Sequence, residues 1–582
     1  MPEGSERPLQ QPEHELAPTR SWRPDWFLLI VLLAGSYLIL TNLGETGLWT
    51  DEAEAANLGV SILEHGLPTA FDGRNYMTQW VVAKREDFND EMVWVLSPWL
   101  QLYVSAASFK LLGVTTLAAR LPFALVGIAC LWMIFALAKR ATRDVRIART
   151  ASLLLLTSIP FLLHSRQGRY YPIAMFATMW TLHAYIGMLE HKKWSTLHIV
   201  VAISVLFHAN YGLCVPLIGA LVIHALFYAW GRARLWQVIA VPAWIGALTL
   251  PWALYAEIHR TASRLDLTPY FYNFFTYVHQ VNRWAMPLVF VVAFAILRSL
   301  GWKSSVLNAK NIGVTAAAMI GFVGVAFLAM NVGLFARYII NVIPLFVFLN
   351  ACFVVWIVDS LKERVGASAG RTAWGFVPLL MFTTVVAWPF APLLRMGAMN
   401  APHKAFQDNP AVRNPLTDFE GPKHEIFALV EELHQPYDGP LERLADFLNT
   451  NASREHTLYI DYGDVPLLFT TDLIIRGGLQ GIPYHGKPEW IVSRSNRAGI
   501  AVNALREFAE EEGYVQVVFT DTPDTRWENR PDPYVHFYEP PPVGNVARLT
   551  DGVYPPVVLY MRPDLELVDS MGAKVGRRGG RR

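Results

Sequence analysis

The sequence predicts an all-α polytopic membrane domain of about eleven spanning helices, followed by a small C-terminal α/β soluble domain. Hydrophobic residues make up 53% of the 582-residue chain and charged residues only 17%, which is typical of a polytopic membrane protein. The long apolar runs end near residue 395, and the remaining chain alternates short helix-like and strand-like segments. These observations divide the chain into a membrane part and a soluble part.

Eleven runs have roughly the 17–25 apolar residues that a membrane helix needs. We predict them at residues 26–43, 119–138, 147–165, 171–189, 195–210, 212–230, 236–256, 284–300, 312–331, 338–358 and 372–394. Residues 1–25 are polar, and the run after them is long enough to stay in the membrane. We therefore expect a cytoplasmic N-terminal tail rather than a cleaved signal peptide.

Positive charge on the connecting loops predicts the orientation, because basic loops stay in the cytoplasm. If the apolar segment Ser97–Gly113 lies along the surface instead of crossing, fifteen basic residues fall on the N-terminal side and six on the other. The fifteen lie in loops 139–149, 192–193, 232–234, 298–310 and 362–371. We therefore predict a cytoplasmic N-terminus in the inner membrane, outer loops at about 43–117 and 257–284 with juxtamembrane helices, and a periplasmic or extracellular C-terminal domain.

Residues 396–570 are predicted to form this outer domain. Helix-like stretches alternate with strand-like ones, which is typical of an α/β layer. The helix-like stretches are Glu425–His434, Leu441–Thr450 and Val502–Glu512, and the strand-like ones are Leu458–Asp461, Trp490–Ser493, Val515–Thr520 and Tyr534–Tyr538. The basic tail at 571–582 is predicted to be disordered.

Composition also limits the classes of binding partner that are expected. A net charge of +1 and the lack of a basic stripe give no sign of nucleic-acid binding. Cys130, Cys214 and Cys352 all fall in apolar runs, which argues against disulfides and cysteine-based metal sites. The bilayer is the partner that the composition predicts directly.

An acidic pair, Asp51 and Glu52, follows the first apolar run within about ten residues. Acids at the mouth of a hydrophobic span are expensive to keep near lipid, and they usually serve chemistry or ions. The alternative is local, since Thr50 or Asp51 is suited to cap a helix predicted at Ala53–Glu64. Capping and catalysis are compatible, because a cap fixes the direction of the side chain.

Four arginines lie where predicted helices meet the outer interface, against the charge bias that orients the chain. They are Arg166, Arg169, Arg283 and Arg337. A guanidinium offers a permanent charge and several fixed donors, which suits it to clamp a phosphate. The alternative for each is a side chain that snorkels to lipid headgroups or pairs with a local acid.

This arrangement resembles the GT-C glycosyltransferases, and within them the branch of protein O-mannosyltransferases and the lipid A aminoarabinose transferase (glycosyltransferase family 39-like). The resemblance covers about residues 26–395. It rests on the acidic pair, a surface helix led by Pro98, and four segments in the same order. These are Arg120–Gly127 (RLPFALVG), Gly168–Tyr171 (GRYY), Tyr270–Phe275 (YFYNFF) ahead of Arg283, and Arg337-Tyr338 leading to Ile343–Leu345.

The resemblance implies a glycosyltransferase that moves a sugar from a polyprenyl-phosphate carrier to an envelope glycan, lipid or protein hydroxyl acceptor on the outer face. It assigns the general base to Asp51, with Glu52 orienting it or the acceptor. Arg283 would meet the carrier phosphate, and one displacement with inversion at the anomeric carbon is expected. The helpers that it suggests at the phosphate are Arg169, Arg337, Arg166, Tyr170 and Tyr338.

The chain departs from the family pattern at one point. Relatives often carry a Pro-Pro or His-Pro-Pro step before the surface helix, sometimes with a basic residue ahead of it, whereas here the sequence reads Ser97-Pro98. That phosphate contact is therefore missing or supplied by Lys84 or Arg85. No metal or other cofactor is assigned. An oxygen-rich metal site could in principle be assembled from Asp51, Glu52, Glu54, His65 and Asp72.

Three other functions stay open at this stage. A lipid-linked glycan polymerase or ligase would share the arginines but would not need the acidic pair. A lipid flippase or transporter normally needs polar groups at mid-membrane, and no Asp, Glu, Lys or Arg falls at the centre of a predicted span. A receptor or scaffold would have no use for arginines clustered at the rim.

Overall fold

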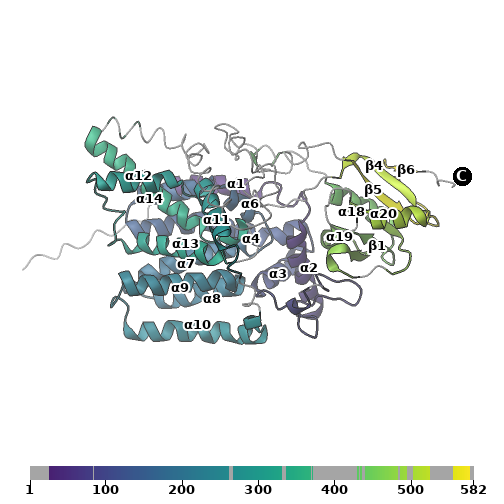
Figure 1. Cartoon of the computed structure of the whole chain (residues 1–582), viewed down its shortest axis with the longest axis horizontal. Coiled ribbons are helices and arrows are strands. Elements are labelled where there is room, and N and C mark those ends of the chain that lie inside the picture. Colours follow the sequence, from purple (N-terminus) through teal and green to yellow (C-terminus); the bar gives the residue numbers. More distant parts are fainter. Residues whose placement is uncertain are drawn as a thin grey trace, which may run out of the picture.

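The computed structural model describes residues 25–82, 84–260, 266–330, 336–366, 439–482, 485–494, 502–524 and 555–576, with isolated positions between 368 and 434. These residues form a bundle of apolar helices, an end cap (residues 43–115) that lies across one end of the bundle, and an α/β domain beyond the cap (Figure 1).

The bundle contains five described helices that are each long and apolar enough to cross a membrane. A sixth candidate is a pair of helices bent by 65°. The five are α4 (Thr116–Thr142), α7 (Tyr171–Leu189), α9 (Tyr211–Tyr228), α10 (Leu235–Tyr255) and α14 (Ile343–Val365), and the bent pair is α5 (Val145–Leu156) with α6 (Ile159–Ser165). Shorter apolar helices are α1 (Trp26–Leu40), α8 (Ser195–Ala209), α12 (Leu288–Ser299) and α13 (Ile312–Leu328).

Ten of the eleven predicted spans coincide with these helices, counting the bent pair once, and the eleventh, at 372–394, falls almost wholly outside the described residues. The total of eleven therefore stays a prediction. Two boundaries differ because of proline, which favours the first turn of a helix. Helix α14 begins at Ile343 instead of residue 338, just before Pro344. The run 147–165 breaks at Thr157–Ser158, and α6 restarts with Pro160 in its first turn.

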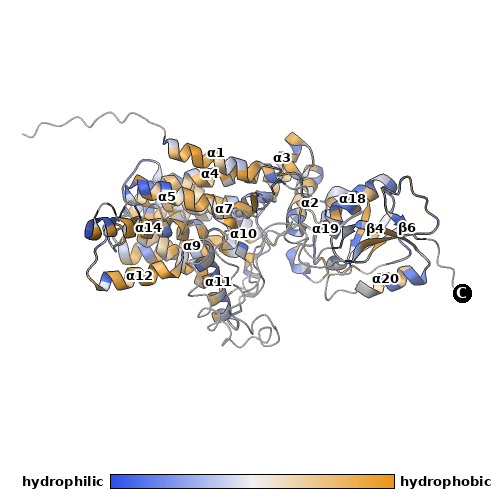
Figure 2. Cartoon of the chain, turned by 90° about the horizontal axis from the view of Figure 1, so that it is seen from above, coloured by the Kyte–Doolittle hydropathy of each residue, from blue (hydrophilic) through white to orange (hydrophobic). Residues whose placement is uncertain are grey.

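The outside of the bundle is apolar, as a lipid-facing surface requires. The bundle helices are predominantly hydrophobic in Figure 2, whereas the α/β domain is mixed. Helix α10 illustrates this, because it exposes Leu235, Ile239, Trp244 and Leu254. A contiguous apolar surface of this kind is not stable in water, so the chain is a multi-pass membrane protein.

Ion pairs gather at the end of the bundle where α1 begins. Arg149 pairs with Asp25 at 3.0 Å, and Arg146 pairs with Asp359 on α14 at 2.7 Å. These arginines belong to the most basic predicted loop, 139–149. That loop therefore lies at the opposite end of the bundle from the end cap, which follows the other end of α1.

The end cap is built around α2 (Thr50–His65) and α3 (Leu100–Leu112), which pack against each other. Helix α3 corresponds to the predicted surface segment Ser97–Gly113. Its 13 residues span about 20 Å, less than the roughly 30 Å hydrocarbon core. Helix α2 begins three residues before its predicted start and has Trp49 as its N-cap. The idea that Thr50 or Asp51 caps this helix is therefore wrong, because both lie within its first turn.

Helix α11 (Tyr270–Trp284) lies in the second predicted outer loop and packs against α13 and α14. Short 3-10 helices complete this end of the bundle. They are η1 (Arg85–Asp87) and η2 (Ile258–Arg260), together with η4 (Ala336–Ile339) just ahead of α14.

The described part of the C-terminal domain contains a six-stranded mixed sheet in the order β2-β1-β3-β5-β4-β6, in which β2, β1 and β3 are parallel and the other pairs antiparallel. Its strands are β1 (Thr457–Ile460), β2 (Ile474–Gly477), β3 (Trp490–Val492), β4 (Val515–Pro523), β5 (Pro556–Met561) and β6 (Lys574–Val575). Its helices are α18 (Pro440–Asn451), α19 (Asp464–Thr470), η9 (Gly478–Gln480) and α20 (Val502–Glu511).

The predicted α/β layer is confirmed for α18, α20, β1, β3 and β4. The strand predicted at Tyr534–Tyr538 and most of the helix at Glu425–His434 lie outside the described residues. Strands β2 and β5 were not predicted. The predicted disordered tail began at residue 571, which is too early, because Lys574 and Val575 form strand β6. They pair with Val518 and Val517 of β4, and without them this side of β4 would be unpaired.

Two parts of the α/β domain dock on the end cap. Helix α19 packs against α2, with Val465 fully buried and its carbonyl oxygen accepting from Asn57 Nδ2 at 3.1 Å. The edge strand β2 is covered by residues 74–76. There the Asn75 side chain donates to the Leu473 carbonyl at 2.8 Å and accepts from the Ile475 N–H at 2.9 Å. One amide thus pairs the open edge of the sheet as a neighbouring strand would.

We predict that Asn75→Ala loosens this contact by about 1–3 kcal/mol, because it leaves two buried backbone groups unpaired. Faster amide hydrogen exchange at Ile475 and across residues 74–82 measures the effect. Asn449→Ala is the control, since Asn449 makes a single exposed bond to Thr470 inside the domain. Equal exchange in the two variants would contradict the docking role of Asn75.

Candidate active site

A cavity of about 1050 Å³ lies where the bundle meets the end cap. Its walls come from segments far apart in the sequence: the start of α2, residues 79–98, the turn before α7, the start of α9, η2, the end of α13 and η4. Its size is at the upper end of the range for a substrate pocket. Polar side chains from the cap face apolar ones from the bundle, including Leu213, Val215 and Leu328.

Asp51 lies in the cavity wall between two guanidinium groups. Its carboxylate is 3.3 Å from Arg337 Nη2. Arg169 Nη1 donates to the Asp51 main-chain oxygen at 2.8 Å. Arg337 also stacks on Trp49, with its guanidinium carbon 5.3 Å from the ring centroid, which fixes the direction of its positive charge. The structure therefore brings together one acid and two of the four predicted arginines.

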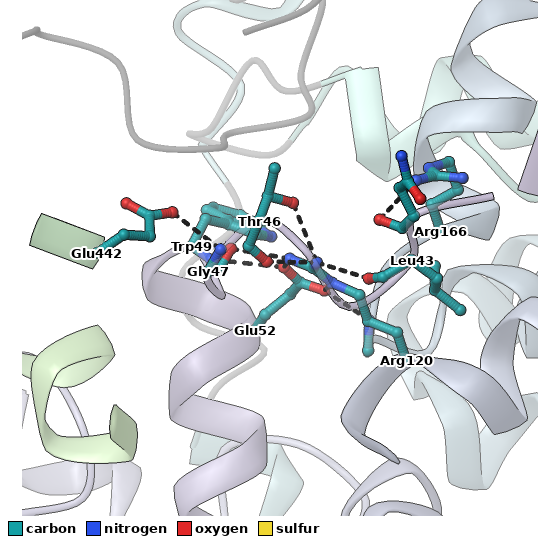
Figure 3. Close-up of polar contacts among 10 residues, drawn as sticks. Leu43, Thr46, Gly47, Trp49, Glu52, Arg120, Arg166 and Glu442 are labelled. Atoms are coloured by element: carbon teal, nitrogen blue, oxygen red, sulfur yellow. Dashed lines mark hydrogen bonds and ion pairs between the residues drawn. The ribbon is translucent and has the colours of Figure 1, made fainter. Parts of the chain in front are cut away.

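Glu52 faces the other way, into the protein, and is not among the residues that line the cavity. Only 1% of it is exposed, and it binds Arg120 of α4 through two hydrogen bonds of 2.9 and 2.8 Å (Figure 3). Arg120 also donates to the carbonyl oxygens of Leu43, Thr46 and Gly47, which connect α1 to α2. The Glu52–Arg120 pair thus links α4 to the segment that precedes α2.

The Glu52 carboxylate also holds the turn before α7. The Gly168 N–H donates to Glu52 Oε1 at 2.7 Å. A Cβ at position 168 would lie 2.8 Å from the Ala119 carbonyl oxygen, so only glycine allows this approach. The next residues, Arg169 and Tyr170, are thereby directed into the cavity.

Arg166 lies outside the cavity wall. Its Nη1 donates to the Leu38 and Ile39 carbonyl oxygens at 3.0 and 2.9 Å, at the last turn of α1. The structure therefore places it where it supports a helix end. Of the predicted phosphate-binding residues, Arg169, Arg337, Tyr170 and Tyr338 line the cavity. Arg283 lies in α11, and its side chain is outside the described part of the chain.

Glu54 is another carboxylate in the cavity wall, and the sequence predicted no catalytic role for it. It lies on α2 three residues after Asp51, so the two share a helix face. Its Oε2 accepts from the Gln79 N–H at 3.1 Å. Burial raises the pKa of Glu54 to about 7, and the negative charge of Asp51 acts in the same direction. The signal that could have found it is the spacing of Asp51 and Glu54.

The rest of the polar wall comes from residues 79–98, which include Trp80, Lys84, Asp87 and Trp94. Lys84 Nζ lies 5.4 Å from the Trp80 ring centroid. Lys84 is one of the two residues that the sequence offered as a substitute phosphate contact, and the side chain of the other, Arg85, is outside the described residues. The exposed indole ring of Trp80 beside this cation provides a flat surface for a polar ring with an anionic substituent.

Within the described chain, no three His, Cys, Asp or Glu side chains come together as a metal site would need. Of the acids considered for an oxygen-rich site, Glu52 is bound to Arg120. His65 lies at the far end of α2, 3.8 Å from Glu64. The charged side chains that line the cavity thus include three carboxylates (Asp51, Glu54 and Asp87) and three cations (Lys84, Arg169 and Arg337).

The fold is shared with a solved membrane enzyme. The chain superposes on ArnT from Cupriavidus metallidurans bound to undecaprenyl phosphate with a TM-score of 0.52 and 14% identity, covering 78% of this chain and 85% of that one. Apo ArnT gives a TM-score of 0.49 and 15% identity over the same shares. The oligosaccharyltransferase AglB from Archaeoglobus fulgidus, with an inhibitory peptide and a dolichol-phosphate, gives 0.42 and 11%, covering 77% and 64%.

No protein-family profile and no curated protein sequence matches the chain. At these identities the likeness to ArnT establishes the fold. The chain therefore has the fold of ArnT.

We predict that Glu52→Gln lowers the free energy of unfolding by about 3–5 kcal/mol, because it leaves the Arg120 charge buried without its carboxylate. Denaturant unfolding of the purified protein in detergent measures the loss. Glu190→Gln is the control, since Glu190 is 29% exposed and its pairs with Arg140 and Arg143 contribute less than about 1 kcal/mol. A loss for Glu52→Gln as small as that of the control would refute the structural role of Glu52.

Proposed function

We propose that this protein is a glycosyltransferase that moves a sugar from a polyprenyl-phosphate carrier to a hydroxyl group of an envelope glycan, lipid or protein. The observation that carries the proposal is the placement of Asp51 beside Arg337 and Arg169 in a cavity at one end of an apolar bundle. The fold shared with ArnT and the motif resemblance to GT-C glycosyltransferases support the same reaction class.

Asp51 is suited to act as the general base. It lies at the first turn of α2 with its carboxylate in the cavity wall, and Arg169 anchors its main chain. In the proposed reaction the acceptor oxygen attacks the anomeric carbon as its proton passes to Asp51. The bond from that carbon to the phosphate oxygen breaks, and its electron pair leaves with polyprenyl phosphate. One such displacement inverts the anomeric configuration.

The arginines are suited to stabilise the leaving phosphate. Its negative charge grows as the bond breaks, and fixed guanidinium donors favour that charge in a partly buried site. Arg337 is 9% exposed and Arg169 also lines the cavity. When the carrier phosphate draws Arg337 towards itself, the Asp51 carboxylate is released for the acceptor. The Asp51–Arg337 pair therefore favours a reaction in which the donor binds before the acceptor.

An apolar path for the polyprenyl chain runs from the cavity along α9. Val215 belongs to the cavity wall and is 51% exposed. Ile218, Val222 and Leu226 follow it at helical spacing and are also exposed. A carrier lying on this face would keep its chain in the bilayer while its phosphate reaches the arginines.

We place the reaction on the outer face of the cytoplasmic membrane. The end cap, the cavity and the α/β domain lie at one end of the bundle, and the basic loop 139–149 lies at the other. Basic loops remain in the cytoplasm, which supports a cytoplasmic N-terminus and an outer C-terminal domain. Mass analysis of envelope glycans and lipid-linked sugars, with and without this protein, would identify the sugar and acceptor and separate transfer of one sugar from polymerisation.

The base assignment predicts that Asp51→Asn reduces turnover by about 10²–10⁴-fold, because the amide cannot take the acceptor proton. Affinity for polyprenyl phosphate should stay equal or become tighter, since Arg337 no longer has an acid to pair with. Single-turnover transfer and carrier binding are the two measurements. Wild-type turnover in this variant would reject Asp51 as the base.

The clamp assignment predicts that Arg337→Ala weakens polyprenyl phosphate binding by about 10–100-fold, as expected for loss of hydrogen bonds to a charged group. Arg149→Ala serves as the matched control, because Arg149 pairs with Asp25 at the other end of the bundle. Titration of each variant with the carrier in detergent gives the affinities. An unchanged dissociation constant for Arg337→Ala would exclude the clamp.

A further inference from the structure

Two of the three carboxylates in the cavity wall, those of Asp51 and Glu54, lie on the same helix α2 in unequal surroundings. Asp51 has a guanidinium partner at 3.3 Å. Glu54 has only the Gln79 N–H as a hydrogen-bond donor, and within the described residues it has no ion-pair partner. The charged groups that act on Glu54 are the acids Asp51 and Asp87, with Arg169 as the opposing cation.

These different surroundings suit Asp51 and Glu54 to different roles. A buried carboxylate without an ion-pair partner is stabilised in its neutral form. The pKa of about 7 that burial gives Glu54 means that it exchanges its proton close to neutral pH. Pairs of acids whose surroundings differ in this way commonly divide the proton-handling steps of a reaction.

We propose that Glu54 is the final acceptor of the proton that Asp51 removes from the acceptor hydroxyl. The inference rests on the proposed function. The O–H bond of the acceptor breaks and its proton passes to Asp51. It then moves through water in the cavity to the Glu54 carboxylate, which becomes neutral, and leaves for the solvent after the product. Asp51 is again ionised and free to pair with Arg337.

The proposal gives the reaction a defined pH dependence. Below its pKa Glu54 already holds a proton and cannot accept another. Above that pKa it is ionised and ready. Turnover of the wild-type protein should therefore rise between about pH 6 and pH 8, with its midpoint near the pKa of Glu54.

Glu54→Gln tests this with little change of shape, because the amide oxygen can still accept from the Gln79 N–H. We expect turnover at pH 8 to fall about 10–100-fold, the rise between pH 6 and pH 8 to disappear, and polyprenyl phosphate affinity to change less than twofold. Glu64→Gln is the control, since Glu64 lies on the same helix, is exposed, and is outside the cavity wall. It should keep the wild-type rate and pH profile.

Wild-type turnover with an unchanged pH profile in Glu54→Gln would overturn the proposal. If that variant unfolds, Glu54→Asp decides, because it keeps a carboxylate: a retained rise with pH supports the proposal and its loss refutes it. Asp51→Asn, measured in parallel, distinguishes a failure of the Glu54 proposal from a failure of the proposed function. An inactive Asp51→Asn beside a wild-type-like Glu54→Gln removes only the role of Glu54, whereas an active Asp51→Asn removes the proposed base itself.

Discussion

The buried ion pair between Glu52 and Arg120 is the constraint on which the geometry of the cavity depends. Arg120 gathers three carbonyl groups between α1 and α2, and Glu52 reaches the turn before α7 through Gly168. Separating any of these segments would leave a charge or a peptide group buried and unpaired, which proteins rarely tolerate. The pair thereby fixes both Asp51, which is next to Glu52, and Arg169, which is next to Gly168, without entering the cavity itself.

Helix periodicity explains why two adjacent acids have such different surroundings. Successive residues on a helix point about 100° apart, whereas residues three apart point to nearly the same side. With α2 beginning at Thr50, Glu52 is directed into the protein while Asp51 and Glu54 share the cavity face. Arg166 and Arg169 lie in the turn between α6 and α7 instead of in a helix, and there Arg166 turns towards the end of α1 and Arg169 towards the cavity.

Much of the architecture could be predicted because hydropathy and proline positions are local properties of the chain. The bundle helices, the surface helix α3 and strands β1, β3 and β4 followed from them, as did the placement of Asp51, Arg169 and Arg337 at the same end. The different roles of Asp51, Glu52 and Glu54 could not be predicted from these local properties. It depends on the start of α2, which the sequence placed three residues late, and on Arg120, which is 68 positions away from Glu52. Strand β2 was missed for a similar reason, because its partner at the open edge is the side chain of Asn75, 400 positions before Ile475.

Asn75 connects the α/β domain to the segment that holds Glu54. Its amide imitates a peptide unit, so the α/β domain and the membrane part share a hydrogen-bonding pattern as well as a surface. The segment that contains Asn75 continues into Gln79, whose backbone holds Glu54. Replacing the domain with an unrelated one would therefore disturb chemistry deep in the neighbouring cavity.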